Sequence, residues 1–115
     1  MRLSYPRTKY SNIRTEVDGI KFDSRHEAAR YTELKILERA GLIRDLELQH
    51  PFELIPKQVR DGKVVERAVK YIADFVYFDK DGNLVVEDAK GMRTDAYKLK
   101  KKMMRFMHGI EIKEV

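Results

Sequence analysis

The stretch Val85-Val86-Glu87-Asp88-Ala89-Lys90-Gly91 decides how the chain is interpreted, because an apolar run ends in an acid and a lysine two positions apart. Alternate residues of a strand project to the same face, so a strand here would place Asp88 and Lys90 beside Leu84 and Val86. A carboxylate and an ammonium group on a core-facing surface are costly to bury unless they are paired or hold an ion. The pattern therefore predicts a strand that ends in an acid and a lysine with a functional or structural role.

A second apolar run, Ala73-Asp74-Phe75-Val76-Tyr77-Phe78, is joined to the first by the turn-forming segment Asp79-Lys80-Asp81-Gly82-Asn83. A three-residue loop with its glycine left-handed is a common hairpin connection for such a sequence. It would set Asp74 directly opposite Asp88, with Cβ atoms roughly 4.5–5.5 Å apart. A two-residue loop would shift the register by one and bring Asp74 to the face of Glu87. We favour the first register because it keeps the large apolar residues together, and the second stays open.

Two carboxylates that oppose each other across a hairpin destabilise the sheet, because like charges repel at that distance. A surface ion pair between Asp88 and Lys90 would contribute little and would not explain the opposed Asp74. The two acids therefore favour a bound cation.

The 115 residues, 43% of them apolar, are enough for one domain with a single core. The absence of cysteine leaves neither a disulfide framework nor a thiol metal site, and it is compatible with a reducing cytoplasm. No apolar run is long enough to span a membrane, and Met1-Arg2-Leu3 does not begin a signal peptide. We therefore expect a cytoplasmic protein.

The net charge of +5 is distributed unevenly along the chain. Residues 1–14 carry four basic and no acidic groups, and residues 90–105 carry seven basic groups against one acid, whereas the remaining residues are net acidic. Basic segments of this kind indicate a polyanion-binding surface, with mere solubility as the competing explanation. The residues that we expect to bind nucleic acid are Arg93, Lys98, Lys100, Lys101, Lys102 and Arg105.

The first part of the chain predicts an arm, a hairpin and a helix. Residues 1–15 mix bases with aromatics and are interpreted as a basic N-terminal arm, for which stacking on nucleic acid and simple disorder both stay open. Residues 16–115 form the single domain. Two short apolar segments around Asp18-Gly19 predict a small hairpin. Ser24 with Glu27 three residues later predicts the start of a helix that runs to Ala40.

The second part predicts strands and another helix. Residues 42–55 are expected to be extended, with Pro51 indicating a break or an edge, and residues 56–63 are expected to form a turn before the strand that holds Asp74. Thr94 and Gly109 bound a second predicted helix. Its apolar stripe is expected to be Leu99, Met103, Phe106 and Met107, and a short strand follows it. The predicted fold is α/β, in the order α-β-β-β-α-β.

An Asp, a hairpin and then Asp-x-Lys form the signature of the PD-(D/E)XK nuclease superfamily, which the chain resembles from about Val17 to its end. Within that superfamily it is similar to small phage- and prophage-encoded nucleases with a Holliday-junction-resolvase-like core. The other matching segments are Asp18-Gly19-Ile20-Lys21-Phe22-Asp23-Ser24, Glu27 within its helix, and Leu48-Gln49. The chain departs from the pattern in having Ala73, and not proline, before Asp74.

The resemblance implies a restriction-endonuclease-like core, a mixed central sheet flanked by two helices. It implies a metal-dependent endodeoxyribonuclease that hydrolyses phosphodiester bonds in the cytoplasm of a bacterial host, with branched or junction DNA as one substrate class. Two-strand cutting by such enzymes also implies a homodimer. A non-catalytic nucleic-acid-binding module of the same fold is the alternative, and a small structural or interaction protein is the third class.

The site that the resemblance implies holds Mg²⁺ or Mn²⁺ on Asp74, Asp88, the Ala89 carbonyl and Glu27. Lys90 would orient the attacking water and stabilise charge at the phosphate. Glu27 has two open interpretations, as a metal ligand and as part of the helix cap. Gln49 is a further candidate because some members of the superfamily place a glutamine nearby.

Overall fold

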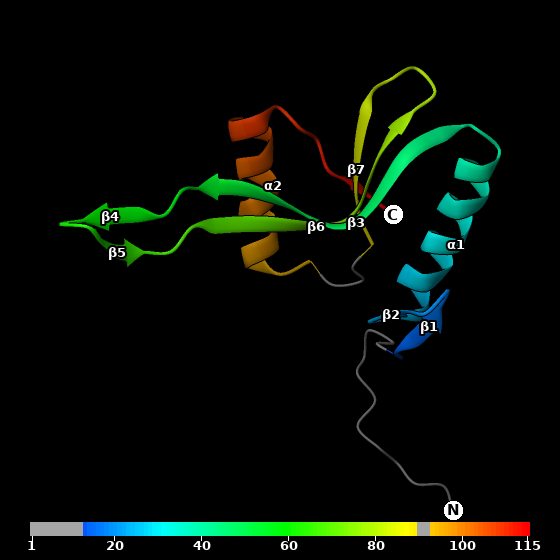
Figure 1. Cartoon of the computed structure of the whole chain (residues 1–115), viewed down its shortest axis with the longest axis horizontal. Coiled ribbons are helices and arrows are strands. Elements are labelled where there is room, and N and C mark those ends of the chain that lie inside the picture. Colours follow the sequence, from blue (N-terminus) through cyan, green and yellow to red (C-terminus); the bar gives the residue numbers. More distant parts are fainter. Residues whose placement is uncertain (1–12, 90–92) are drawn as a thin grey trace, which may run out of the picture.

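The computed structural model describes residues 13–89 and 93–115 (Figure 1). Its elements are, in order, β1 (Thr15–Val17), β2 (Ile20–Phe22), α1 (Arg25–Arg39), β3 (Ile43–Ile55), β4 (Gln58–Arg60), β5 (Lys63–Glu66), β6 (Val69–Asp79), β7 (Leu84–Asp88), α2 (Asp95–His108) and β8 (Lys113–Glu114). The central sheet has the strand order β3-β6-β7-β8, with β8 parallel to β7 and the other neighbours antiparallel. The fold is therefore mixed α/β, as expected, and the helices and central strands follow the predicted order α-β-β-β-α-β. Within the described parts of the chain, neither helix is both long and apolar enough to cross a membrane.

Two short hairpins stand outside the central sheet. The first, β1–β2, confirms the hairpin predicted around Asp18-Gly19. The second, β4–β5, corrects the prediction of a turn over residues 56–63, because only Asp61-Gly62 turns and short strands pair on either side of it. Pro51 does not break β3, which is an edge strand of the central sheet, so the edge interpretation of that proline is confirmed. A proline in an edge strand needs no partner for its missing N–H.

The β6–β7 hairpin has the register that keeps the large apolar residues together. Val76 pairs with Val86, and Phe75 pairs with Glu87. The Gly82 N–H donates to the Asp79 carbonyl over 3.0 Å, and Gly82 has a φ of 82°. The three-residue loop is therefore confirmed, and the two-residue alternative is wrong. One further step of the same register sets Asp74 opposite Asp88.

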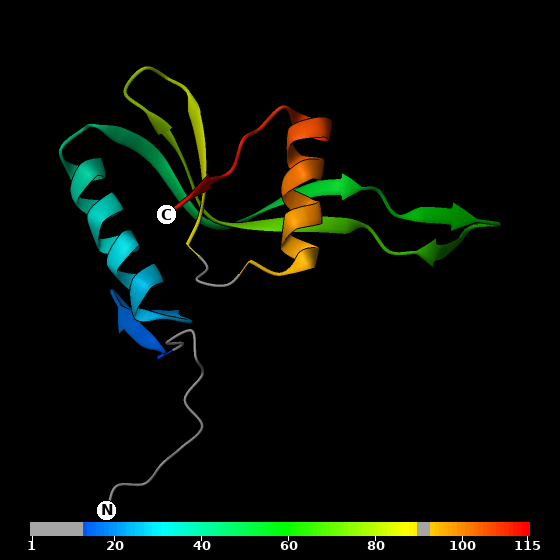
Figure 2. The ribbon, with the colours of Figure 1, turned by 180° about the vertical axis from the view of Figure 1, so that it is seen from behind.

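The long ribbon of β3 and β6 packs against α1 along one part and against α2 along the other (Figures 1 and 2). Leu48 packs in the α1 cluster, whereas Phe52, further along β3, packs in the α2 cluster. Between them lies Gln49, whose φ of 54° is left-handed although its neighbours on both sides pair with β6. A left-handed backbone is uncommon for a residue that is not glycine, asparagine or aspartate, so the position is strained. The strain falls where the ribbon changes from one helix to the other.

Helix α2 buries a different stripe from the one predicted. Of the four predicted residues only Met103 packs against the core, whereas Leu99, Phe106 and Met107 are exposed, Phe106 to 87%, and the fully buried residue is Met104. The helix is oriented by polar contacts at its two ends: the Tyr97 hydroxyl donates to Glu114 over 2.7 Å, and His108 Nε2 lies 2.7 Å from the Glu53 carbonyl oxygen. These contacts accompany the packing of Met103 and Met104, and the richest apolar stripe in the sequence is not the one that faces the sheet.

Helix α1 is joined to β7 by a buried ion pair that the sequence analysis did not anticipate. The Arg30 guanidinium donates two hydrogen bonds to the Glu87 carboxylate, over 2.8 and 2.6 Å, and Glu87 is fully buried. The Tyr77 hydroxyl also donates to this carboxylate, and burial together with that bond raises the pKa of Tyr77. Glu87 thus faces α1, away from Asp88, and its charge is compensated on that side of the sheet.

We predict that Arg30→Met destabilises the protein by about 3–5 kcal/mol, because it leaves the Glu87 carboxylate buried without its cation. Urea unfolding followed by circular dichroism would measure the loss. Lys113→Met is the matched control, since Lys113 approaches the same carboxylate to 3.9 Å from an exposed position and should cost less than about 1 kcal/mol. Equal losses in the two variants would contradict the central role of the Arg30 contact.

Candidate functional site

Three elements bring Glu27, Gln49 and Asp74 together. The Gln49 side-chain amide donates to Glu27 Oε2 and to Asp74 Oδ1, each over 3.3 Å. Glu27 is 4% exposed and Asp74 is 1% exposed, so both carboxylates are withdrawn from water. The cap of α1 uses the backbone N–H of Glu27, which donates to Ser24 Oγ over 3.1 Å. The Glu27 carboxylate therefore takes part in the cluster while Ser24 caps the helix.

Asp88 lies on the neighbouring strand with its own set of donors. It is 2% exposed, and its Oδ2 accepts a hydrogen bond of 2.8 Å from the Tyr71 hydroxyl. Burial, and then the negative charge of Asp88, raise the pKa of Tyr71, so this hydroxyl keeps its proton and donates at neutral pH. The next residue, Ala89, donates its backbone N–H to Asp74 Oδ2 over 2.7 Å. The end of β7 therefore contributes to both carboxylates: it carries Asp88 as a side chain, and the backbone N–H that follows it binds Asp74.

A pocket of about 290 Å³ reaches the cluster from the side of the β1–β2 hairpin. Glu27 and Gln49 form part of its wall, and the remaining lining comes from Ile20, Lys21, Phe22, Asp23 and Leu48. A small molecule or an extended chain segment can therefore approach Glu27 and Gln49 without unfolding the sheet.

The donor chemistry of this cluster suits a hard cation. In residues 13–89 and 93–115, no three His, Cys, Asp or Glu side chains form a group that could hold a metal ion on their own. Mg²⁺ does not need such a cage, because it usually takes one or two carboxylates and keeps several waters. Asp74 and Asp88 supply two carboxylates, so the residues fit such an ion. Lys90, the remaining member of the expected site, lies outside the described residues, as does the N-terminal arm up to residue 12.

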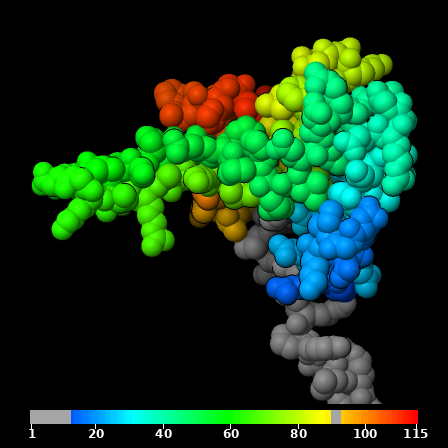
Figure 3. Space-filling view, viewed as in Figure 1, coloured from blue at the N-terminus to red at the C-terminus, as the bar shows by residue number. Residues whose placement is uncertain are grey.

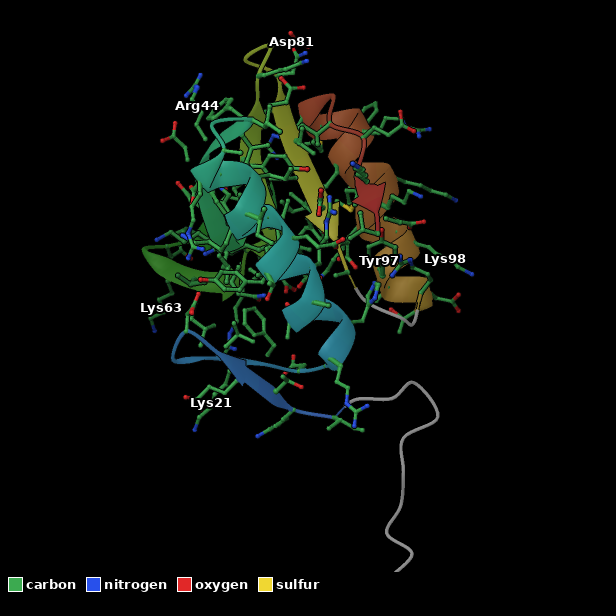
Figure 4. The ribbon with its side chains drawn as sticks, turned by 90° about the vertical axis from the view of Figure 1, so that its right-hand side faces the viewer. Lys21, Arg44, Lys63, Asp81, Tyr97 and Lys98 are labelled. Atoms are coloured by element: carbon green, nitrogen blue, oxygen red, sulfur yellow. The ribbon has the colours of Figure 1, made fainter. Side chains whose placement is uncertain are left out.

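A groove of about 450 Å³ follows one face of α2 and carries most of the predicted basic residues. Its lining consists of Arg93, Tyr97, Lys98, Lys101, Lys102, Arg105 and Glu114. Four of the basic residues on the helix recur at spacings of three and four, which places them on one face. Lys100 is not part of this lining. It lies two residues from both Lys98 and Lys102, and residues two apart in a helix project to roughly opposite sides. Figure 4 shows Tyr97 and Lys98 projecting from this part of α2.

Arg93 connects the acidic cluster with the basic groove. Its Nη1 lies 3.5 Å from Asp88 Oδ1, and its Nε lies 3.3 Å from Glu114 Oε2. Glu114 also accepts hydrogen bonds from Tyr97 over 2.7 Å and from Lys101 over 3.1 Å. These two donors hold the pKa of Glu114 below its ordinary value of 4.5. A polyanion bound along α2 would thus lie next to Asp88.

Comparison with known proteins gives a family for this chain. A family model described as a protein of unknown function, DUF1064, matches residues 7–113. The chain belongs to the DUF1064 family. No curated protein and no solved structure matches it. The match covers both the acidic cluster and the basic groove of this DUF1064 protein, and the family's description names no activity.

We predict that Glu114→Gln lowers the stability of the DUF1064 protein by less than about 1 kcal/mol at neutral pH. The pKa of Glu114 in the folded protein lies below its unfolded value of 4.5. The carboxylate therefore contributes its stabilisation above pH 4.5, and this contribution is lost as the pH falls through the folded pKa. Urea midpoints of the two proteins should therefore differ at pH 7 and converge in acid. Glu111→Gln, which removes an exposed pair with Arg105, is the control. A difference that grows towards low pH would contradict the assignment.

Proposed function

We propose that this DUF1064 protein is a metal-dependent endodeoxyribonuclease that hydrolyses phosphodiester bonds with the chemistry of the PD-(D/E)XK superfamily. The observation that carries the proposal is that Arg93, which lines a basic groove, contacts the buried carboxylate of Asp88, which in turn lies opposite the buried Asp74. Buried acids alone would suit many structural roles, and a basic groove alone would suit any polyanion. Acids next to a basic groove would place a phosphodiester bound in the groove beside a cation held by the acids.

The arrangement of the elements supports the same proposal. A restriction-endonuclease-like core requires an α-β-β-β-α-β order with its two acids at the end of one hairpin. The chain has that order, and the register of its β6–β7 hairpin continues to Asp74 and Asp88. Glu27, on the helix that precedes the sheet, is joined to Asp74 through Gln49. We therefore propose that Glu27 supports Asp74 at the site through Gln49.

In the proposed mechanism, Asp74, Asp88 and the Ala89 carbonyl bind the ion. A bound Mg²⁺ or Mn²⁺ supplies positive charge for the phosphate and lowers the pKa of an attacking water. Gln49 holds Glu27 and Asp74 at a fixed spacing, and the Tyr71 hydroxyl holds one oxygen of Asp88. Lys90 orients the attacking water and stabilises charge at the scissile phosphate. The bases along α2 bind the phosphates on either side of the reacting one.

A non-catalytic nucleic-acid-binding module of the same fold is the second candidate, and one observation favours it. The Gln49 amide donates to both Glu27 and Asp74, so it offsets part of their repulsion without any metal. In such a module the acids would be a structural cluster beside the DNA. Cleavage in the presence of metal separates the two candidates.

We predict that the wild-type protein cuts DNA with Mg²⁺ or Mn²⁺ and not with EDTA, and that Asp88→Asn lowers the rate at least roughly 100-fold. Even residues one shell away from a metal affect activity by roughly 10–100-fold, and a ligand should matter more. The assay would compare linear duplex, single-stranded and four-way-junction DNA, because junction cutting would also favour the homodimer that twofold substrates require. Lys90→Ala should abolish cutting as well.

The control for the cleavage experiment is Asp81→Asn, which changes an exposed carboxylate at the tip of the same hairpin (labelled in Figure 4). It should cut like the wild type, and all variants should unfold at similar urea concentrations. DNA binding without cutting under any condition would favour the binding module. Cutting by Asp88→Asn at the wild-type rate would refute the proposed site.

We predict that Lys98→Gln with Lys102→Gln weakens DNA binding and lowers the salt slope by about 2, because each lost phosphate contact releases about one counterion fewer. Fluorescence anisotropy of labelled DNA over a range of salt concentrations would measure both quantities. Lys100→Gln, on the same helix but outside the groove, should change the slope by much less. An equal effect of Lys100 would show that the groove is not the binding surface.

A further inference from the structure

The β4–β5 hairpin projects from the body of the protein, beyond α2 (Figures 1 and 3). Every residue from 55 to 67 is exposed, including Val59, Val64 and Val65, each about half-exposed. A two-stranded hairpin with no face buried is marginally stable in water. An exposed hairpin with three half-exposed valines therefore calls for a partner that residues 13–89 and 93–115 do not supply.

The hairpin is nevertheless built as a defined element. Val59 pairs directly with Val64, and Arg60 pairs directly with Lys63. The turn between them consists of Asp61 and Gly62, with φ values of 53° and 76°. Two positive φ values in a two-residue Asp-Gly loop are typical of a type I′ turn, whose twist matches that of the flanking strands. The hairpin also prolongs β3 and β6, the two longest strands of the sheet.

The charges of the hairpin favour an anionic partner. Residues 56–68 contain four basic side chains, Lys57, Arg60, Lys63 and Arg67, against the two acids Asp61 and Glu66. The directly opposed pair of Arg60 and Lys63 is unfavourable by itself, because like charges facing each other destabilise a ribbon. An anion between the two side chains would remove that repulsion.

The position of the hairpin connects it with the groove on α2. His108, the last residue of α2, lies with its Nε2 2.7 Å from the carbonyl oxygen of Glu53, two residues before the end of β3. The C-terminal end of α2 is therefore held at the root of the hairpin. Of the groove residues on α2, Arg105 is therefore the one closest in sequence to the end of the helix that lies at the root of the hairpin.

We infer that the β4–β5 hairpin binds double-stranded DNA by entering its major groove. The inference rests on the proposed function in taking DNA as the polyanion of the α2 groove. A two-stranded ribbon fits the major groove, which is about 12 Å wide. Arg60 and Lys63 would then contact phosphates, and the Val59–Val64 pair would lie against the apolar edges of the bases, where thymine presents its methyl group.

The hairpin charges disfavour a second copy of the chain as its partner. Pairing two such hairpins edge to edge would bring the basic side chains of both together, with only two acids on each to offset them. Duplex DNA offers the opposite charge along the whole ribbon.

The test is the binding of labelled duplex and single-stranded oligonucleotides of equal length by Arg60→Gln with Lys63→Gln, in EDTA and over a range of salt concentrations. We expect weaker duplex binding with a salt slope lower by about 2, and little change for the single strand, which has no major groove. The variant should fold, because it removes two opposed like charges. Arg39→Gln with Lys80→Gln, two exposed bases on α1 and on the β6–β7 turn, is the control of equal charge and should bind like the wild type.

Each outcome decides the inference separately from the nuclease proposal. Unchanged duplex binding by the hairpin variant overturns the inference, whether or not the wild type cuts DNA. A wild-type dimer that becomes a monomer in the variant, with duplex binding unchanged, overturns it in favour of pairing between chains. Failure of metal-dependent cleavage, with duplex binding still reduced in the variant, overturns only the nuclease proposal.

Discussion

The structure depends on the burial of two consecutive carboxylates in β7. Glu87 and Asp88 point to opposite faces of the strand, and both are almost completely withdrawn from water. A buried charge is tolerated only with partners, so each face of the sheet has to supply them. On one face α1 supplies Arg30 to Glu87, and on the other Tyr71 and Arg93 approach Asp88. Helix α1 is thus held to β7 by an ion pair as well as by its apolar stripe, whereas the partners of Asp88 lie on β6 and just before α2.

The elements with strong local signals could be predicted from the sequence. Ser24 and Thr94 as N-caps, Gly109 as a C-cap and Asp79 to Asn83 as a hairpin loop all act within a few residues, so tertiary packing had little chance to override them. The strands of the β4–β5 hairpin were missed because three or four residues on either side of Asp61-Gly62, with few apolar side chains, are too short a run to show the alternation of a strand. The stripe of α2 was right for Met103 but wrong for Leu99, Phe106 and Met107, because the rotation of the helix depends on contacts with other elements that form only in the fold.

The candidate site could be predicted in part for the same reason. A hairpin register relates Asp74 to Asp88 through local pairing, and helical spacing turns Glu27 towards the core. The roles of Tyr71 and Arg93 depend on contacts between separate elements, which a single sequence does not reveal. Arg30 left a usable signal, because it lies one turn before Leu34 on the buried stripe of α1. A basic side chain on a buried stripe requires a buried acid as its partner, and Glu87 is the acid on the face of β7 that packs against α1.

The costs that gather around Gln49 argue that this part of the fold was not shaped for stability. Its left-handed backbone is strained by about 1–3 kcal/mol, and it lies between two carboxylates that are each costly to bury. A glycine at position 49 would remove the strain of the left-handed backbone. Strained backbone and buried like charges persist together where they serve binding or chemistry. The pocket that opens onto Glu27 and Gln49 would give the proposed chemistry access from solvent.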